Sequence, residues 1–394
     1  MKRNNTHEST GILSLSLLLT STMAISGTLP AMLQHFAGHS RIWVEYLVSA
    51  PQIAMVIIIA LGPFITKILS ERFTIILGLC IIGTAGSTPF FFDSFLIIMF
   101  SRILLGVGIG LMNTRAVSMI GERFEGARRA RLLGFRQSAE TIGQTFMTLV
   151  AGQLLILSWK SSFLVYTFSF LVLILYLAFV PAANSPETIE TRKDEQNKKQ
   201  KMTQKELAFS LINAAFAGLL ISTNVTNALR IPGFIVDSGI GTAVDGNNIL
   251  SLSMFAGFLS GVVFGKMMSK LKRLLLPCFL CTGAVGLLMI ALTGSRMGVT
   301  VGAFINGFSV AGCVSYVFTS LSENVTKASL NTANTFVLVG CNLGAASSPV
   351  ILKMIGVINP RLFVSFFAYA VVFVCIAAAI LVVSHLKRGD VNVG

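Results

Sequence analysis

The chain contains a series of apolar segments that repeats itself 199 residues further along. Residues 62–80 (GPFITKILSERFTIILGLC) and residues 261–279 (GVVFGKMMSKLKRLLLPCF) both leave an apolar helix, cross a short basic loop and enter the next apolar helix. Within these ranges Lys67 corresponds to Lys266. The chain is therefore expected to consist of two similar halves built from apolar helices.

The composition places most of the chain in lipid. Its 394 residues are 54% hydrophobic and 12% charged, with a mean hydropathy of +0.79, whereas a soluble domain carries about 25% charged residues. A helix needs about 20 apolar residues to cross a bilayer, and the apolar runs predict twelve such helices. We expect them at residues 10–33, 45–67, 74–92, 94–117, 132–157, 161–181, 206–228, 247–268, 274–293, 297–320, 331–354 and 361–386. The predicted fold is an all-α membrane protein of twelve transmembrane helices in two pseudo-symmetric six-helix bundles.

One long polar stretch divides the chain. Residues 184–205 (NSPETIETRKDEQNKKQKMTQK) are highly charged, which predicts a flexible cytoplasmic linker. The linker separates an N-terminal six-helix bundle, residues 1–183, from a C-terminal six-helix bundle, residues 206–394. A second polar interruption at residues 236–248 is rich in Gly, Asp and Asn and is expected to be the outer loop between the seventh and eighth helices.

The net charge of +14 is a topology signal. Cytoplasmic loops of membrane proteins concentrate Lys and Arg, and most of the 30 basic residues fall on one side when the N-terminus is placed inside. Both termini are therefore predicted to be cytoplasmic, in a multi-pass protein of the bacterial inner (plasma) membrane. The basic charge also favours contact with anionic membrane lipids, and we expect no nucleic-acid partner.

Two groups of residues form recognisable motifs. The loop after the second helix contains Gly62, Lys67 and Arg72. In the fourth helix Arg102 is followed by three glycines at alternate positions, which are Gly106, Gly108 and Gly110. The glycines allow another helix to approach closely, and an arginine at this depth is costly unless it faces a cavity or a partner.

The repeat, the twelve helices and the central linker resemble the major facilitator superfamily over nearly the whole chain, and the first half most resembles its drug:proton antiporter branch. The resemblance implies that Gly62, Lys67 and Arg72 belong to the conformational loop motif after the second helix. Thr66 stands at the aspartate position of that motif, so its ion pair cannot form there, although Glu71 is a candidate substitute.

The other two motifs of the branch match to different degrees. Arg102 and the glycines that follow it match the helix 4 motif. Gly143 matches the glycine-rich helix 5 motif, but Thr148 occupies its proline position, and the proline occurs instead at Pro349 in the second half. Gly143 and Gly344 each follow a glutamate by 21 residues, which adds to the internal repeat.

The fifth helix carries a pair of charges inside the membrane. Arg136 and Glu140 are four residues apart and therefore share one helical face. Glu140 is the only acidic residue that we place well inside a helix, and the antiparallel fourth helix puts Arg102 at a similar depth. We hypothesise that Glu140 carries the transported proton with Arg102 near it. The alternative is that Arg136 and Glu140 only brace each other.

Further polar residues are candidates for a substrate cavity. Arg136 and Arg230, the latter near the outer end of the seventh helix, would contribute charge. The alternative for Arg230, which its position favours, is that it anchors the helix at the membrane interface. Asn224 and Asn306 would contribute amides, which need partners inside a membrane whether they bridge helices or bind substrate.

These features favour a secondary transporter, in which two similar halves alternate around a central site. The chain has no GxxxxGK[ST] sequence for ATP and no metal-binding spacing, so we expect no enzyme activity, no cofactor and no metal. The leading hypothesis is proton-coupled efflux of small amphipathic or cationic compounds by a monomer. The alternatives are a transporter of a small anionic metabolite, which Arg102, Arg136 and Arg230 would favour, and a non-transporting membrane sensor.

Overall fold

The computed structural model describes residues 4–124, 126–180, 202–326 and 329–391, and these are built from helices and turns. Up to residue 180 the helices are α1 (Asn4–Ser16), η1 (Ser21–Met23), η2 (Ser26–Thr28), α2 (Leu29–His35), α3 (Arg41–Ile68), α4 (Glu71–Phe91), α5 (Phe95–Arg123), α6 (Gly126–Leu154), η3 (Ser161–Thr167) and α7 (Phe168–Phe179). From residue 202 they are α9 (Gln204–Asp237), α10 (Ala243–Leu271), η4 (Lys272–Leu274), α11 (Leu275–Leu292), α12 (Arg296–Asn324), α13 (Leu330–Ile358) and α14 (Phe363–Val391).

The helices are long and apolar enough to cross a membrane. Ten candidate spans occur in the described residues, and the pair Ser9–Ser16 and Ser21–His35, bent by 41°, makes an eleventh. The predicted span that these candidates leave out is the fifth, at residues 132–157. It corresponds to α6, which has 29 residues and so is about 44 Å long at 1.5 Å per residue, but carries four arginines and a glutamate. The prediction of an all-α membrane protein is confirmed.

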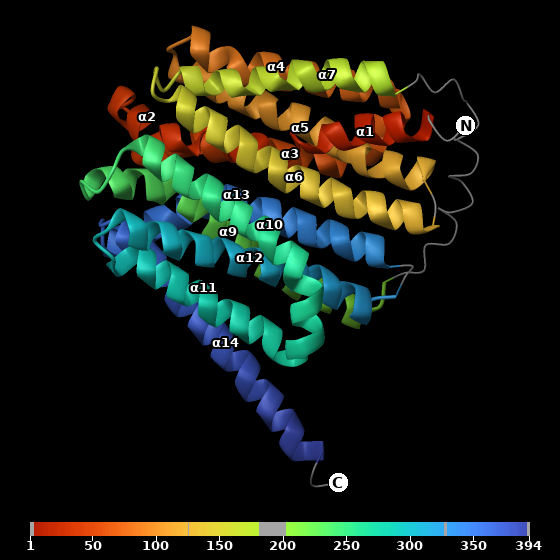
Figure 1. The fold of residues 1–394 in the computed structure, drawn as a ribbon, viewed down its shortest axis with the longest axis vertical. Helices are drawn as coiled ribbons and strands as arrows, with labels where there is room; N and C mark the ends of the chain where they lie inside the picture. The colour runs from red at the N-terminus through yellow and green to blue at the C-terminus, as the bar shows by residue number, and fades with distance from the viewer. Residues whose placement is uncertain (1–3, 125, 181–201, 327–328, 392–394) are drawn as a thin grey trace.

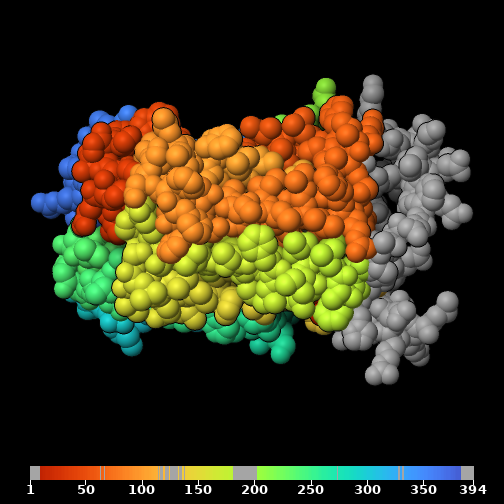
Figure 2. Space-filling model, turned by 90° about the horizontal axis from the view of Figure 1, so that it is seen from above, coloured from red at the N-terminus to blue at the C-terminus, as the bar shows by residue number. Residues whose placement is uncertain are grey.

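The two groups of helices lie side by side. Figure 1 shows α1 to α7 above α9 to α14, with most axes roughly aligned. Figure 2, viewed from the side of the first group, shows α4 and α7 lying next to each other over its outer face. Residues 181–201, which include most of the predicted linker, lie outside the described residues, so the boundaries of the two bundles stay a prediction.

Close contacts between helices repeat with a constant offset. A Cβ atom on Gly143 would lie 2.1 Å from the carbonyl oxygen of Leu17, and one on Gly344 would lie 2.0 Å from that of Gly218. Both residues of the second pair follow those of the first by 201 positions. Only glycine allows helix backbones to approach so closely, so α6 packs on the first span as α13 packs on α9.

One loop is shorter than the sequence suggested. Residues 236–248 were expected to form an outer loop, but α9 continues to Asp237 and α10 begins at Ala243. The prediction was wrong because Thr242 and Asp245 form a capping box, in which each side chain bonds the backbone of the other residue. The cap starts the helix early and places Asn247 inside α10.

We call the two ends of the bundle distal and proximal. The distal end carries α2 and the starts of α3, α5, α10, α12 and α14, and lies at the left of Figure 1. The proximal end carries the starts of α1, α4, α6 and α9. The charge pattern of the sequence predicts that the distal end faces outward.

The second half contributes to the core of the first half only from two helices among the described residues. Their apolar side chains all come from the distal parts of α9 and α13, and are Ile221, Val225, Leu229, Ala345 and Leu352. The halves are therefore packed together toward the distal end.

Candidate functional site

Arg136 and Glu140 form an ion pair within α6. Their side chains are 17% and 9% exposed, respectively, so both charges are largely removed from solvent. A carboxylate in this setting is stable as a charge only while its partner stays in place, because isolated charges are costly inside a membrane. The pair lies in the middle third of α6. Its net charge changes when Glu140 gains a proton.

The first span is broken beside this pair. α1 ends at Ser16, and η1 begins only at Ser21. The Ser21 hydroxyl donates to the carbonyl oxygen of Leu18 at 2.8 Å, which is the local bonding by which serine competes with a regular helix. Thr20, within the break, donates from Oγ1 to the backbone oxygen of Glu140 at 3.2 Å. Broken helices lie at the substrate or ion sites of many transporters.

Arg102 is fully buried in α5 and bonds backbone carbonyl groups. Its Nε donates to the oxygen of Leu47 at 2.8 Å, and its Nη2 donates to the oxygen of Thr22 at 2.9 Å. The guanidinium carbon lies 5.8 Å and 5.3 Å from the ring centroids of Phe163 and Tyr166. Nη1 is buried without an acceptor among the described residues. Arg102 thus ties the broken first span to α3.

The expected contact between Arg102 and Glu140 does not form in this conformation. Arg102 donates to backbone carbonyl groups of the first span and of α3, whereas Glu140 pairs with Arg136. The reason is that the bend after α1 exposes the Thr22 carbonyl, which needs a donor inside the membrane. Both residues nevertheless contact the broken segment, Arg102 at Thr22 and Glu140 at Thr20.

The glycines of α5 lie at close approaches to its neighbours. Cβ atoms would lie 2.2 Å from the Pro51 oxygen at Gly106, 2.9 Å from the Gly78 oxygen at Gly108, and 2.8 Å from a side-chain carbon of Ile58 at Gly110. α3 and α4 can therefore pack directly on α5, and this packing brings the Leu47 carbonyl within reach of Arg102.

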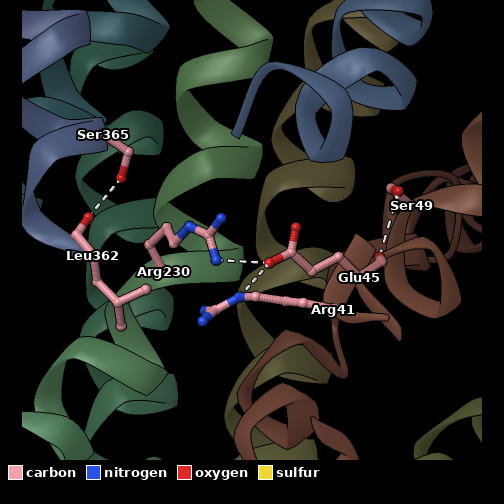
Figure 3. A network of polar contacts seen from close by, with 6 residues as sticks. All are labelled: Arg41, Glu45, Ser49, Arg230, Leu362 and Ser365. Carbon is pink, nitrogen blue, oxygen red and sulfur yellow. Dashed lines mark hydrogen bonds and ion pairs between the residues drawn. The ribbon is translucent and has the colours of Figure 1, made fainter. Parts of the chain in front are cut away.

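Arg230 joins the two halves at the distal end. Its Nη1 donates to Oε1 of Glu45 at 2.6 Å, and the same oxygen accepts from Nε of Arg41 at 2.9 Å (Figure 3). Glu45 is 1% exposed and Arg230 6%. The sequence pattern did not single out Glu45, because the predicted second helix begins at residue 45 and a residue at a helix end is expected to be solvated. The observed helix α3 begins four residues earlier, at Arg41. The four-residue spacing from Arg41 was the available signal.

Asn247 forms a second bridge between the halves. Its Oδ1 accepts from the backbone nitrogen of Gly27 at 3.1 Å, and its Nδ2 donates to the oxygen of Thr148. Nearby, Nε2 of Gln153 donates to Oδ1 of Asn248 at 3.2 Å. These contacts join the first span and α6 to α10, again in the distal parts of the helices.

The two asparagine candidates for the cavity differ in their surroundings. Asn306 is fully buried, accepts from Asn227 at 2.8 Å and donates to the oxygen of Gly283 at 3.2 Å, so it bridges helices of the second half. Asn224 is exposed in the middle of α9 and has no hydrogen-bond partner among the described residues. Asn224 is thus available to a ligand in this conformation, whereas Asn306 is not.

The loop motif residues lie at the proximal end. Gly62 is buried near the end of α3, Lys67 is exposed with its ammonium 5.9 Å from the ring centroid of Phe64, and Arg72 is half-buried at the start of α4. The side chain of Thr66 lies outside the described part of the chain. Arg115 of α5 donates from Nη2 to the oxygen of Leu69 at 3.2 Å, so a basic residue does tie this loop to α5.

Two cavities lie near the distal half of α3. The larger, of 540 Å³, lies between α3 and α5 and is lined only by apolar and aromatic side chains, several of them exposed, such as Trp43, Ile53 and Ile57. The smaller, of 370 Å³, is lined by residues of α3, α9, α13 and α14, including Glu45 and Arg230. Neither cavity is lined by Glu140.

Comparison with known proteins identifies the family. No curated protein sequence matches the chain. Among solved structures, the chain is similar to a variant of the peptide transporter POT in complex with sulfate, with a TM-score of 0.71, 14% identity, and coverage of 95% of this chain and 94% of that one. It is also similar to POT in complex with alafosfalin, with a TM-score of 0.68, 14% identity and 94% coverage of each chain. The sequence profile of the Major Facilitator Superfamily matches residues 11–349. The chain therefore belongs to the Major Facilitator Superfamily of membrane transporters.

Proposed function

We propose that the chain is a proton-coupled exporter of small amphipathic or cationic compounds that works by alternating access. The observation that carries this proposal is the ion pair of Arg136 and Glu140, which is largely buried beside the break in the first span. A carboxylate that exchanges a proton there changes the local charge beside the break in the first span. The similarity to peptide transporters, at 14% identity, concerns the fold and does not identify the substrate.

Glu140 is the proposed proton carrier. When it is charged, it holds Arg136, and the next turn of α6 packs on Leu17 through Gly143. When it is protonated, Arg136 loses its partner and becomes available to other groups or to water. Arg102 is proposed to act as a positioning residue, because it holds the Thr22 carbonyl and keeps the far side of the break fixed to α3.

In the proposed transport cycle, the contacts at the distal end hold the two halves together and close that end in this conformation. Glu45 with Arg230, and Asn247 with Gly27, join the halves there. If the termini are cytoplasmic, as the charge pattern predicts, this conformation is closed toward the outside. Rocking of the halves would break these contacts and open the distal end.

The second candidate, a transporter of small anions, has weaker support. It required Arg102, Arg136 and Arg230 to line one cavity. Arg102 has no exposed surface and bonds backbone carbonyls, and Arg230 is paired with Glu45 at the distal end. The third candidate, a non-transporting sensor, is distinguished from the two transporters only by the absence of substrate flux.

The experiment is a proton-release assay in proteoliposomes with a pH-sensitive dye in the lumen. A panel of lipophilic cations and a panel of small organic anions are added separately. Cation-dependent proton movement that empty liposomes lack supports the proposal. Flux of anions without proton movement would favour the second candidate, and the absence of flux with either panel would favour the third.

A further inference from the structure

The 370 Å³ cavity at the distal end has an unbalanced charge. Four basic residues line it, namely Arg41, Arg230, Lys353 and Arg361, against one acidic residue, Glu45. Lys353 and Arg361 are exposed, so they stand at its rim, whereas Arg230 is 6% exposed and lies at its floor. The residues that line the cavity therefore carry an excess of positive charge, because Glu45 balances only one of the four cations.

Arg230 uses little of its hydrogen-bonding capacity. A guanidinium has five N–H donors, and only Nη1 donates to an acceptor among the described residues, which is Oε1 of Glu45. Figure 3 shows the other nitrogen atoms of Arg230 pointing away from this contact. Because Arg230 lines the cavity, these donors are available to a molecule inside it.

We propose that this cavity binds a small oxyanion, a carboxylate or a phosphate group, through Arg230. A planar guanidinium matches the paired oxygens of such groups. Lys353 and Arg361 attract the anion at the rim, and apolar residues such as Leu352 and Leu362 contact its organic part. The oxyanion belongs either to a soluble organic acid or phosphate, or to the headgroup of a membrane lipid.

The bound oxyanion shares Arg230 with Glu45. Oε1 of Glu45 accepts from both Arg41 and Arg230, so a ligand that takes up the guanidinium weakens the link between α3 and α9. Occupancy of the cavity thus favours opening of the distal end. This site lies apart from Glu140, and binding there does not depend on the proposed transport function.

The test is equilibrium dialysis of the full chain with radiolabelled inorganic phosphate at constant ionic strength. The chain is placed in nanodiscs of phosphatidylcholine, with or without phosphatidylglycerol. The rim variant Lys353→Gln/Arg361→Gln is compared with Lys205→Gln/Lys270→Gln, which removes two exposed cations of α9 and α10 near their proximal ends. Glu45→Gln removes the carboxylate that competes for Arg230. Size-exclusion profiles check that each variant is folded.

We expect one saturable phosphate site in phosphatidylcholine. Binding should weaken about tenfold, one logarithmic unit of Kd, in the rim variant, stay unchanged in the proximal variant and tighten in Glu45→Gln. Loss of phosphate binding in nanodiscs that contain phosphatidylglycerol assigns the site to a lipid headgroup. Phosphate binding that persists in these nanodiscs assigns the site to a soluble anion. The absence of saturable binding, or equal weakening in the rim and proximal variants, would overturn the proposal whether or not transport is observed.

Discussion

Arg230 of α9 donates to Glu45 of α3 at 2.6 Å, and this buried pair joins the two halves of the molecule. The residues are 185 positions apart in sequence. Burying two charges inside a membrane protein is costly, and the cost is offset only while both partners are present. The pair is therefore suited to hold one conformation and to release it when either charge is neutralised.

Replacing one partner of this pair should cost more than replacing both. Arg230→Gln leaves Glu45 buried with only the partly exposed Arg41, and we expect a loss of about 3–5 kcal/mol in stability. The double variant Glu45→Gln/Arg230→Gln should recover most of this loss, because the one charge that then lacks its partner is on Arg41, whose side chain is 46% exposed. Thermal unfolding of the purified variants measures both effects. Additive losses in the double variant would contradict the coupling.

A methyl group at Gly27 should open the distal end. Its Cβ would lie 2.5 Å from Oδ1 of Asn247, so Gly27→Ala should displace Asn247 and separate α10 from the first span. We expect a cysteine at Asn248 to react faster with a membrane-impermeant maleimide, in a background without the six native cysteines. Gly38→Ala, at the same end with nothing within 4 Å of the added atom, is the control. Equal rates in both variants would count against the role of Asn247.

The contact of Gly143 with Leu17 should tolerate no side chain. Gly143→Ala places Cβ 2.1 Å from a backbone oxygen, which cannot move without shifting the broken segment. We expect a loss of about 1–3 kcal/mol, as for other overpacked sites, and a lower transport rate. Gly261→Ala meets nothing within 4 Å and is the matched control. A Tm and rate for Gly143→Ala equal to those of Gly261→Ala would disprove this packing.

The ion pair of Asp93 with Lys160 at the distal end should stabilise the folded protein by an amount that depends on pH. The Lys160 ammonium bonds Asp93 and holds the pKa of this carboxyl below its usual range, with a smaller contribution from His35. A lowered pKa stabilises the folded state above the unfolded pKa of about 3.9 and ceases to do so as the pH falls through the folded value. Asp93→Asn should therefore lower the Tm slightly at neutral pH, equally at about pH 5, and less below about pH 4. A difference that vanished already between pH 7 and pH 5 would point to another group.

The sequence predicts the spanning helices well because the membrane alone sets the length and the apolar composition that such a helix needs. It also shows the repeat, since Gly143 and Gly344 occupy equivalent close contacts. The capping box of Thr242 and Asp245 was readable in the sequence, but the Gly, Asp and Asn content of residues 236–248 suggested a loop instead.

The contacts between distant helices could not be predicted. Glu45 is buried at the contact between the halves, where Arg230 of the other half pairs with it in addition to Arg41. Within the part of the chain that the structure describes, Arg102 pairs with no carboxylate, because the bend at residues 17–20 offers it the Thr22 carbonyl. Neither fact follows from a local pattern of residues, since each depends on how two separate helices are placed in space.

The most direct test of the proposed function compares Glu140→Gln with Glu45→Gln in proteoliposomes that carry a pH gradient. Uphill transport of a cationic substrate and downhill exchange of that substrate are both measured. We predict that Glu140→Gln abolishes uphill transport and proton movement but retains exchange, because an amide can still pack there but cannot release a proton. Glu45→Gln should retain coupling while its rate changes. Uphill transport that survives Glu140→Gln would contradict the assignment of Glu140 as the proton carrier.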